Sequence, residues 1–201
     1  PKPVITTQTQ TICSNATFNI TPANGGNLIL PANTTYTWTA PTSTPLGAIS
    51  GGTAQLSSVS SISQLLTNNS NSQGVLRYIV TPTSGATGTC PGAPFNVEIT
   101  VSPKPILTST LTPPAICNAT NFSYNPISPT DGVSWIWTRN TITGITNTAG
   151  TGTGVINETL INTSANPITV PYVFALTTYG CPNTQTINPK IFEGNPQIEL
   201  V

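Results

Sequence analysis

The chain has 201 residues, and only ten of them are charged, five Lys or Arg and five Asp or Glu, so its formal net charge is zero. This balance provides no basic surface for nucleic acid or for an anionic membrane. No apolar run approaches the roughly 18 residues of a membrane-spanning helix. No signal peptide is visible, so we expect a mature or excised piece of a protein. The length suits either one large β domain or two domains of about 100 residues.

The first half consists of short segments in which apolar and polar residues alternate, the period of a half-buried strand. Strands are expected at residues 4–9, 17–21, 35–39, 61–68, 75–81 and 95–101. Turn-rich connections with Gly and Pro are expected at 23–33 and 41–52. β-branched and aromatic residues mixed with Thr, Asn and Ser disfavour helices. About seven strands in 100 residues are typical of an immunoglobulin-like sandwich.

The second half repeats the first. Pro103-Lys104-Pro105 repeats the opening Pro1-Lys2-Pro3, and ISQLLTNNS at 62–70 is mirrored by INETLINTS at 156–164. We therefore predict two homologous domains, 1–102 and 103–195, with Pro103, Lys104 and Pro105 as a stiff linker. The last residues, 196–201, are predicted to begin a further repeat or linker. Strands of the second domain are expected at 121–124, 134–138, 156–164, 171–174 and 184–192.

The four cysteines fall two in each half, each pair separated by most of a domain. There is no CxxC pair, so zinc-ribbon and thioredoxin-like sites have no support. We expect one disulfide per domain, Cys13 to Cys90 and Cys117 to Cys181. Such bonds imply export to an oxidising compartment. The alternative is four reduced, buried thiols.

Two tryptophans of the second half share a strand face. Trp135 and Trp137 have the same parity in the predicted strand 134–138, as Tyr36 and Trp38 have in 35–39. One interpretation makes all four core aromatics, with Trp137 equivalent to Trp38 and Trp135 to Tyr36. The other makes an exposed member a platform on which a sugar stacks.

Catalysis is hard to place in this sequence. There is no His, and Asp131 is the only Asp. Glu98 and Glu158 belong to different predicted domains, so no carboxylate pair for glycoside hydrolysis is evident. Carboxylate clusters that would bind Ca²⁺ are missing. The Gly-rich run 148–154 lacks the Lys of a phosphate-binding loop and is predicted to be a flexible loop. We therefore expect no enzyme, no cofactor and no metal.

Several motifs of the first half resemble the PKD-like domains of Bacteroidota. The resemblance is carried by Thr-Tyr-Thr-Trp-Thr at 35–39, Ile-Ser-Gln-Leu-Leu-Thr-Asn at 62–68, Tyr-Ile-Val-Thr-Pro-Thr-Ser-Gly at 78–85, and Phe-x-Val-x-Ile-Thr-Val-x-Pro-Lys-Pro at 95–105. It covers nearly all of 1–103 and is weaker over 104–201. The acidic Trp-x-Phe-Gly-Asp-Gly turn of ordinary PKD domains is absent, since Trp38 is followed by Thr39-Ala40-Pro41. Such domains form arrays in very large surface proteins, including SprB-type gliding-motility adhesins. The resemblance implies delivery by the type IX secretion system to the outer cell surface.

The sequence thus predicts an all-β chain of two disulfide-clipped Ig-like sandwiches that acts as a spacer in a cell-surface adhesin. Its expected partners are neighbouring repeats of the same chain, with surface polysaccharide or the substratum as further candidates, and neither nucleic acid nor inserted membrane. The alternatives are a polysaccharide-binding module and an accessory domain of a secreted enzyme. Flanking copies of the repeat favour the spacer, and an exposed aromatic patch favours the binding module.

Overall fold

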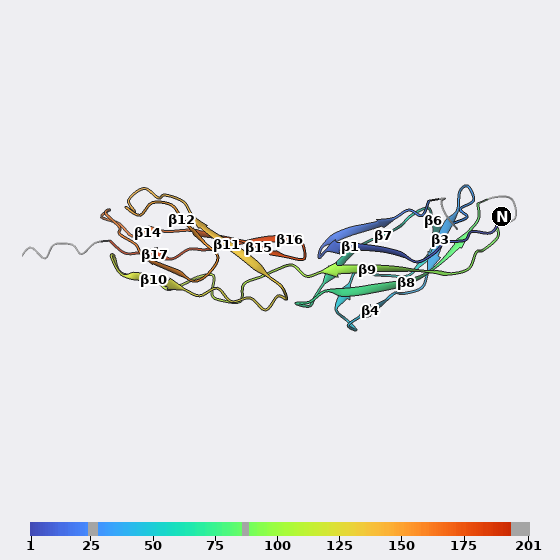
Figure 1. Cartoon of the computed structure of the whole chain (residues 1–201), viewed down its shortest axis with the longest axis horizontal. Helices are drawn as coiled ribbons and strands as arrows, with labels where there is room; N and C mark the ends of the chain where they lie inside the picture. The colour runs from blue at the N-terminus through green and yellow to red at the C-terminus, as the bar shows by residue number, and fades with distance from the viewer. Residues whose placement is uncertain (24–27, 86–88, 194–201) are drawn as a thin grey trace, which may run out of the picture. The chain divides into compact units, whose positions relative to one another are not determined.

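The computed structural model describes residues 1–23, 28–85 and 89–193 (Figure 1). The chain divides into two compact units, domain 1 at 1–104 and domain 2 at 105–201. The division falls two residues after the predicted one. The predicted further repeat at 196–201 lies outside the described residues.

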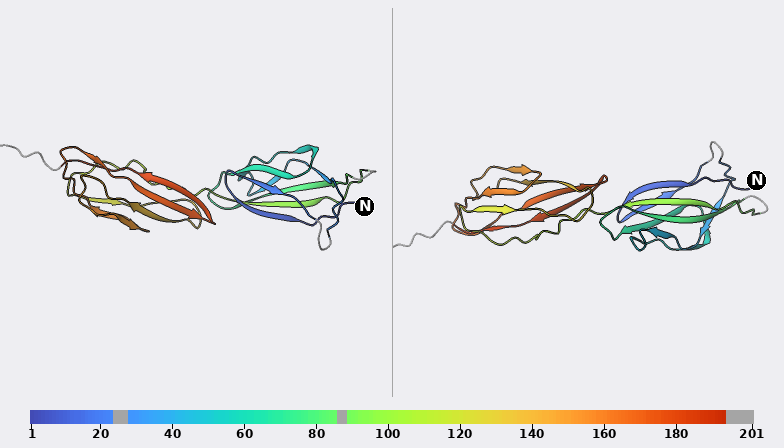
Figure 2. Two further views of the ribbon diagram at one scale, coloured as in Figure 1. Left: turned by 90° about the horizontal axis from the view of Figure 1, so that it is seen from above. Right: turned by 60° about the horizontal axis from the view of Figure 1, so that its bottom comes forward.

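In domain 1, the described residues form nine strands. They are β1 (Gln8–Cys13), β2 (Ala16–Ile20), β3 (Thr35–Trp38), β4 (Thr42–Thr44), β5 (Ile49–Ser50), β6 (Gln55–Val59), β7 (Ile62–Asn68), β8 (Gly74–Thr83) and β9 (Phe95–Ser102). One sheet has the order β1-β9-β8-β3-β6, with β4 also pairing with β8, and the other has the order β2-β7-β5. The two sheets of the domain face each other across its core (Figure 2).

In domain 2, the described residues form eight strands. They are β10 (Asn121–Tyr124), β11 (Ser134–Arg139), β12 (Gly150–Gly152), β13 (Ile156–Thr159), β14 (Ile168–Thr169), β15 (Tyr172–Thr178), β16 (Cys181–Ile187) and β17 (Lys190–Ile191). The main sheet has the order β12-β11-β15-β16, with β10 paired to β13 and β14 to β17. The predicted all-β, Ig-like fold is therefore confirmed. The strands number more than the predicted seven because each domain adds pairings of only two or three residues.

Each core is built around one aromatic cluster that joins the two sheets. In domain 1, Tyr78 lies 5.4 Å from Phe18 of the opposite sheet and 6.1 Å from Trp38 of its own, measured between ring centroids. In domain 2, Tyr172 lies 5.4 Å from Phe122 and 5.8 Å from Trp137. Tilted and edge-on aromatic pairs like these add about 0.5–1.5 kcal/mol each beyond the area that they bury. The two domains thus share one core design.

Several strand predictions differ from the structure; among them, β13 ends at Thr159 and β16 at Ile187, short of the predicted ends at 164 and 192. The first strand begins at Gln8, because Val4 forms only an isolated bridge to Ile29. The connection predicted at 41–52 contains β4 and β5, short strands whose partners β8 and β7 lie far along the chain. β6, at residues 55–59, was not predicted, because three of its five residues are exposed and the apolar alternation is missing.

The Gly-rich run 148–154 was predicted to be a flexible loop, and this is wrong for β12. Gly152 pairs with Trp137 and Gly150 with Arg139. A Cβ atom on Gly152 would lie 2.8 Å from the Trp137 ring, which is closer than carbon atoms approach. The glycine therefore lets the strand lie against the indole, and a close approach of backbone is a common reason for glycine in a strand.

Candidate functional sites

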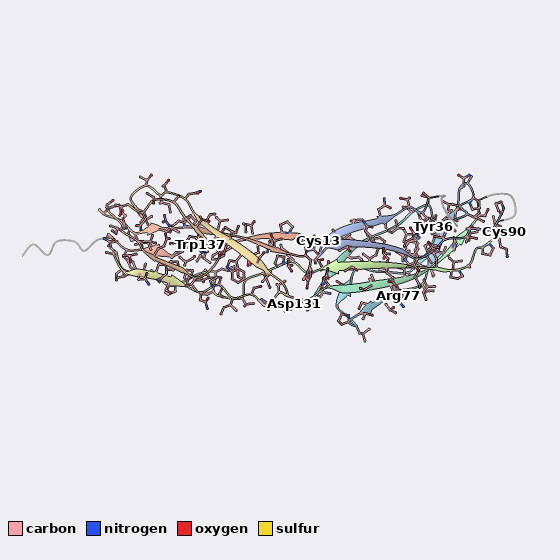
Figure 3. All side chains as sticks on the ribbon, in the orientation of Figure 1. Cys13, Tyr36, Arg77, Cys90, Asp131 and Trp137 are labelled. Carbon is pink, nitrogen blue, oxygen red and sulfur yellow. The ribbon has the colours of Figure 1, made fainter. Side chains whose placement is uncertain are left out.

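Both predicted disulfide pairings are wrong. Cys13 and Cys181 are disulfide-bonded, whereas Cys117 is an exposed, free thiol. Cys13 pairs in register with Ser102 at the end of β9, whereas Cys90 precedes the start of that strand. A strand of this length spans roughly 25 Å, and a disulfide needs Cα atoms within about 7 Å. Cys13 and Cys90 accordingly lie at opposite ends of domain 1 (Figure 3).

The same geometry separates the cysteines of domain 2. Cys117 follows Ile116, which bridges Ile191 in β17, while Cys181 is the first residue of β16. The whole of β16 lies between these two positions. The reason for both errors is that the segment bearing the first cysteine of each domain runs parallel to the last strand, so the two cysteines of a domain end up at its opposite ends.

A partly buried polar network lies at the edge of the core of domain 1. Gln64 accepts hydrogen bonds at Oε1 from the Tyr78 hydroxyl, at 2.9 Å, and from the backbone N–H of Thr53, at 3.0 Å. Its Nε2 donates back to the Thr53 carbonyl oxygen at 3.0 Å, and Nε1 of Trp38 donates to the same oxygen at 2.9 Å. Burial raises the pKa of the Tyr78 hydroxyl, so the phenol stays protonated and remains a donor. This network contains no charge.

Domain 2 has a charged network at the equivalent place. Arg139, with a side chain only 1% exposed, donates from Nε and Nη2 to the two carboxylate oxygens of Glu158, each at 2.8 Å. Its Nη2 also donates to the Thr148 carbonyl oxygen at 2.7 Å. The Tyr172 hydroxyl donates to Glu158 Oε2 at 2.6 Å, and the guanidinium carbon lies 5.9 Å from the Tyr172 ring centroid.

The protonation states follow from these contacts. The hydrogen bonds from Arg139 hold the pKa of Glu158 below its usual value against the opposing effect of burial. The same hydrogen bonds raise the pKa of Arg139. Burial, and then the bond to Glu158, raises the pKa of Tyr172. A bidentate, buried ion pair is therefore charged at neutral pH, and it joins β11, β13 and β15.

A second network, at one end of each domain, is the same in both. Nδ2 of Asn68, at the end of β7, donates to the carbonyl oxygen of Val101 at 2.7 Å, and its Oδ1 accepts from the backbone N–H of Ser70 at 2.8 Å. Asn162 likewise donates to the Ile191 carbonyl oxygen at 3.2 Å and accepts from the N–H of Ser164 at 2.8 Å. Asn68 thus ties β9 to the opposite sheet, and Asn162 ties β17 to the connection that follows β13.

The sequence contains signals for these networks. The alignment of ISQLLTNNS with INETLINTS places Gln64 on Glu158 and Asn68 on Asn162. Arg139 and Trp137 are two residues apart in the predicted strand, so their side chains point to the same face. Since Trp137 was predicted to face the core, the sequence indicates a buried Arg139 cation that needs a carboxylate partner. No such signal marked the partner itself, because Arg139 and Glu158 are 19 positions apart.

The four predicted core aromatics differ in exposure. Tyr36, Trp38 and Trp137 are buried, with exposed fractions of 2%, 4% and 7%. Trp135 is only partly buried, and its Nε1 is enclosed without a hydrogen-bond partner among the described residues. It faces a groove of about 540 Å³. The groove is lined by Val133, Ser134, Trp135, Ile136, Thr153, Ala175 and Thr177.

Other kinds of site are not found in the part of the chain that the structure describes. No three His, Cys, Asp or Glu side chains gather there as a metal site would need. The backbone carbonyl oxygen of Asp131, the only Asp in the sequence, accepts a hydrogen bond from Thr178 Oγ1 at 2.6 Å. Among the described residues, no helix is long and apolar enough to cross a membrane.

Residues 10–105, nearly all of them in domain 1, match the family model of a PKD-like domain. Solved structures with similar folds include a chimeric titin Z1Z2-Z1Z2 tandem, 12% identical with a TM-score of 0.34, over 96% of this chain and 98% of that one. DIP-gamma IG1+IG2 is 8% identical with a TM-score of 0.37, over 96% and 99%. The fibronectin(III)-like modules of CbhA from Clostridium thermocellum are 12% identical with a TM-score of 0.28, over 96% and 94%. No curated protein matches the chain.

PKD-like domains are typically non-catalytic modules with structural or adhesive roles. A PKD-like domain in a chain with disulfide-bonded cysteines indicates a secreted or extracellular protein, because disulfides persist in oxidising compartments.

Proposed function

We propose that this chain is a non-catalytic spacer segment of a large cell-surface adhesin, of the array-forming kind that serves gliding motility in Bacteroidota. The observation that carries the proposal is the repetition of one design. Two successive domains share the aromatic cluster and the asparagine tie. The sequence Pro-Lys-Pro stands at the start of both predicted repeats. In repeat proteins each unit contacts mainly its neighbours, so length grows by adding copies. A spacer requires no reactive group.

The asparagine tie supports a mechanical role. Asn68 bonds the last strand of domain 1 to the end of β7 in the opposite sheet, and Asn162 bonds the last strand of domain 2 to the connection that follows β13. Force applied through the chain ends reaches that last strand first, so side-chain hydrogen bonds there resist its removal. In this proposal, the asparagine hydrogen bonds hold the last strand of each domain in place. The intradomain disulfides that the sequence predicted have no part in it.

The experiment that tests this proposal is a blot of fractionated source cells with an antibody raised against residues 1–193. We expect a cell-surface band much larger than a 201-residue chain, which surface proteolysis removes from intact cells. In-frame deletion of the segment should reduce attachment and spreading without abolishing surface delivery. A small secreted band would contradict the array and the adhesin role together.

A second candidate function is polysaccharide binding, and the groove at Trp135 favours it. The groove combines part of an indole with the hydroxyl side chains of Ser134, Thr153 and Thr177. Aromatic surface beside a few polar groups is the usual lining of a small-ligand site, and sugars offer both an apolar face and hydroxyls.

Affinity electrophoresis in gels that contain bacterial or algal polysaccharides tests this candidate. Binding through the groove predicts retardation that Trp135→Ala abolishes. Leu46→Ala, which changes a side chain 93% exposed on domain 1, is the matched control and should leave retardation unchanged. Equal migration of all three proteins in every gel would exclude the groove as a polysaccharide site.

A further inference from the structure

The first strand of domain 1 forms a hydrogen-bonded ladder with the last strand of that domain. β1 pairs in parallel with β9 over its whole length, from Gln8 opposite Val97 to Cys13 opposite Ser102. The backbone N–H of Ser14 extends the pairing, because it donates to the Ser102 carbonyl oxygen at 2.9 Å. The bonds of a parallel ladder are evenly spaced and come from alternate residues, so the residues of β1 with the parity of Ser14 direct their N–H groups toward β9.

Tension between the two ends of domain 1 loads this ladder in shear. The chain enters β1 at Gln8 and leaves β9 at Ser102, and the two strands run in the same direction. Force on the chain ends therefore pulls the two strands in opposite directions along their own axes. The bonds between them share the load and must break together. A ladder loaded in this way resists more force than bonds that open one after another.

Domain 2 lacks most of this ladder. Among the described residues, its first segment pairs with its last strand at one point, the parallel bridge of Ile116 with Ile191. The Ile116 N–H donates to the Lys190 carbonyl oxygen at 2.9 Å, and its carbonyl oxygen accepts the N–H of Phe192 at 3.0 Å. This bridge corresponds to the pairing of Ile12 in β1. The positions before it form no ladder with the last strand.

A proline explains the difference between the two domains. When Ile116 is aligned with Ile12, Pro114 falls on Gln10. A residue at this position has the parity of Ile116, so its N–H is the one that a ladder requires. Proline has no N–H to donate and interrupts strand pairing for that reason. The first segment of domain 2 therefore cannot continue the ladder beyond Ile116.

Other contacts hold the first segment of domain 2, and they are spread along it. Two side chains of β16 bind its backbone: Asn183 Nδ2 donates to the Pro105 carbonyl oxygen at 2.8 Å, and Gln185 Oε1 accepts the Leu107 N–H. Further bonds from the segment lead to Ile127. Force that enters at Pro105 reaches these contacts in turn, so they open one at a time.

We propose that the β1–β9 ladder is a mechanical clamp and that domain 2, which lacks it, yields first when the chain is stretched. This inference rests on the proposed spacer function, because a spacer between a cell and its substratum is under tension. Domain 2 extends while domain 1 stays folded. The spacer thus lengthens in steps, and the order of the steps is set by strand pairing near the chain entry of each domain.

Stretching the whole chain in an optical trap, by tags fused to its two ends, tests the clamp. A reductant is present, so that Cys13 at the end of β1 carries no load through its disulfide. We expect two unfolding events at different forces. Gln10→Pro removes a donor of the ladder, so it should lower the higher force to the lower one or below it and leave the other event unchanged. If this variant prevents domain 1 from folding, the event that disappears must be the stronger one.

The matched control is Thr11→Pro, because the N–H of Thr11 points away from β9 by the same alternation. It should leave both forces unchanged. Pro114→Gln is the reverse test and should raise the lower force, a gain that a folding defect cannot produce. Equal forces in the unaltered chain, equal losses from Gln10→Pro and Thr11→Pro, or an unchanged lower force in Pro114→Gln would each overturn the proposal.

Failure of the clamp and failure of the spacer are separate outcomes. Equal unfolding forces, together with a large surface band from cells, would refute the clamp alone. A small secreted band would refute the spacer, whatever the forces measured in the trap.

Discussion

The two domains solve one packing problem with different chemistry. In each, a buried tyrosine donates to a side chain of the opposite sheet, Tyr78 to Gln64 and Tyr172 to Glu158. In domain 1 the Gln64 amide forms its other hydrogen bonds with backbone groups of Thr53. In domain 2 the Glu158 carboxylate is paired with the guanidinium of Arg139. The comparison shows that a shared fold fixes where a buried polar group is needed but not whether that group is charged.

The charged version depends more strongly on its partners. Removing one member of a buried ion pair leaves an uncompensated charge, which costs more than a lost neutral hydrogen bond. The surface pair Arg77–Glu98 of domain 1, at 2.8 Å, has the same short distance, but its side chains are 56% and 30% exposed, so solvent screens it. We therefore expect the stability of domain 2 to fall more than that of domain 1 when one member of its network is removed.

The largest effect is expected from Glu158→Ala. It leaves the Arg139 cation buried without its carboxylate, and domain 2 should lose about 3–5 kcal/mol of unfolding free energy. Gln64→Ala in domain 1, the matched control, should cost about 1–3 kcal/mol. Hydrogen-exchange mass spectrometry in urea measures both, because peptides report on each domain separately. Equal losses in the two domains would contradict the comparison.

A double variant converts the network of domain 2 into the neutral type. In Arg139→Met with Glu158→Gln, the methionine fills the volume of the arginine stem and the glutamine accepts from Tyr172 as Gln64 accepts from Tyr78. We expect it to recover about 2 kcal/mol relative to Glu158→Ala. Hydrogen exchange in urea measures this recovery. A double variant no more stable than Glu158→Ala would show that the unpaired charge of Arg139 does not cause the loss of stability.

A smaller loss, about 1–3 kcal/mol, is expected from Gly152→Ala in β12. The added methyl group would lie 2.8 Å from the Trp137 ring, so strand or indole must move. Gly154→Ala is the control, because a Cβ atom there has no atom within 4 Å, and it should change stability by less than about 0.5 kcal/mol. Unfolding followed by tryptophan fluorescence compares the two, and identical midpoints would refute the packing argument.

The smallest difference is expected from pH. The pKa of Glu158 is lowered in the folded state, so its stabilisation is complete above the unfolded value of about 4.3 and is lost as the pH falls through the folded value. Domain 1 has no carboxylate in its network, so domain 2 should lose stability first on acidification. Exchange rates at pH 6 and pH 3, corrected for intrinsic rates, measure this. The Arg139→Met, Glu158→Gln variant should abolish the difference between domains.

The sequence alone determined the features that depend on local alternation and on repetition. The period of two in segments such as 95–101 predicted β9, and the repeated blocks at 62–70 and 156–164 predicted a second domain of the same design. These patterns are readable because a half-buried strand places alternate side chains in the core wherever it lies in the sheet. The aromatic residues of both cores followed from the same parity.

Only the tertiary structure decided which distant groups meet. The parallel register of β1 with β9 places Cys13 beside Ser102, which sets it a strand length away from Cys90. Antiparallel pairing of β11 with β12 brings Gly152 onto Trp137, so a run that reads as a loop becomes a strand. Arg139 reaches Glu158 because β11 and β13 belong to facing sheets. Alternation is a local property of one strand, whereas strand order and direction are properties of the whole sandwich, and these govern the disulfides and the buried charge.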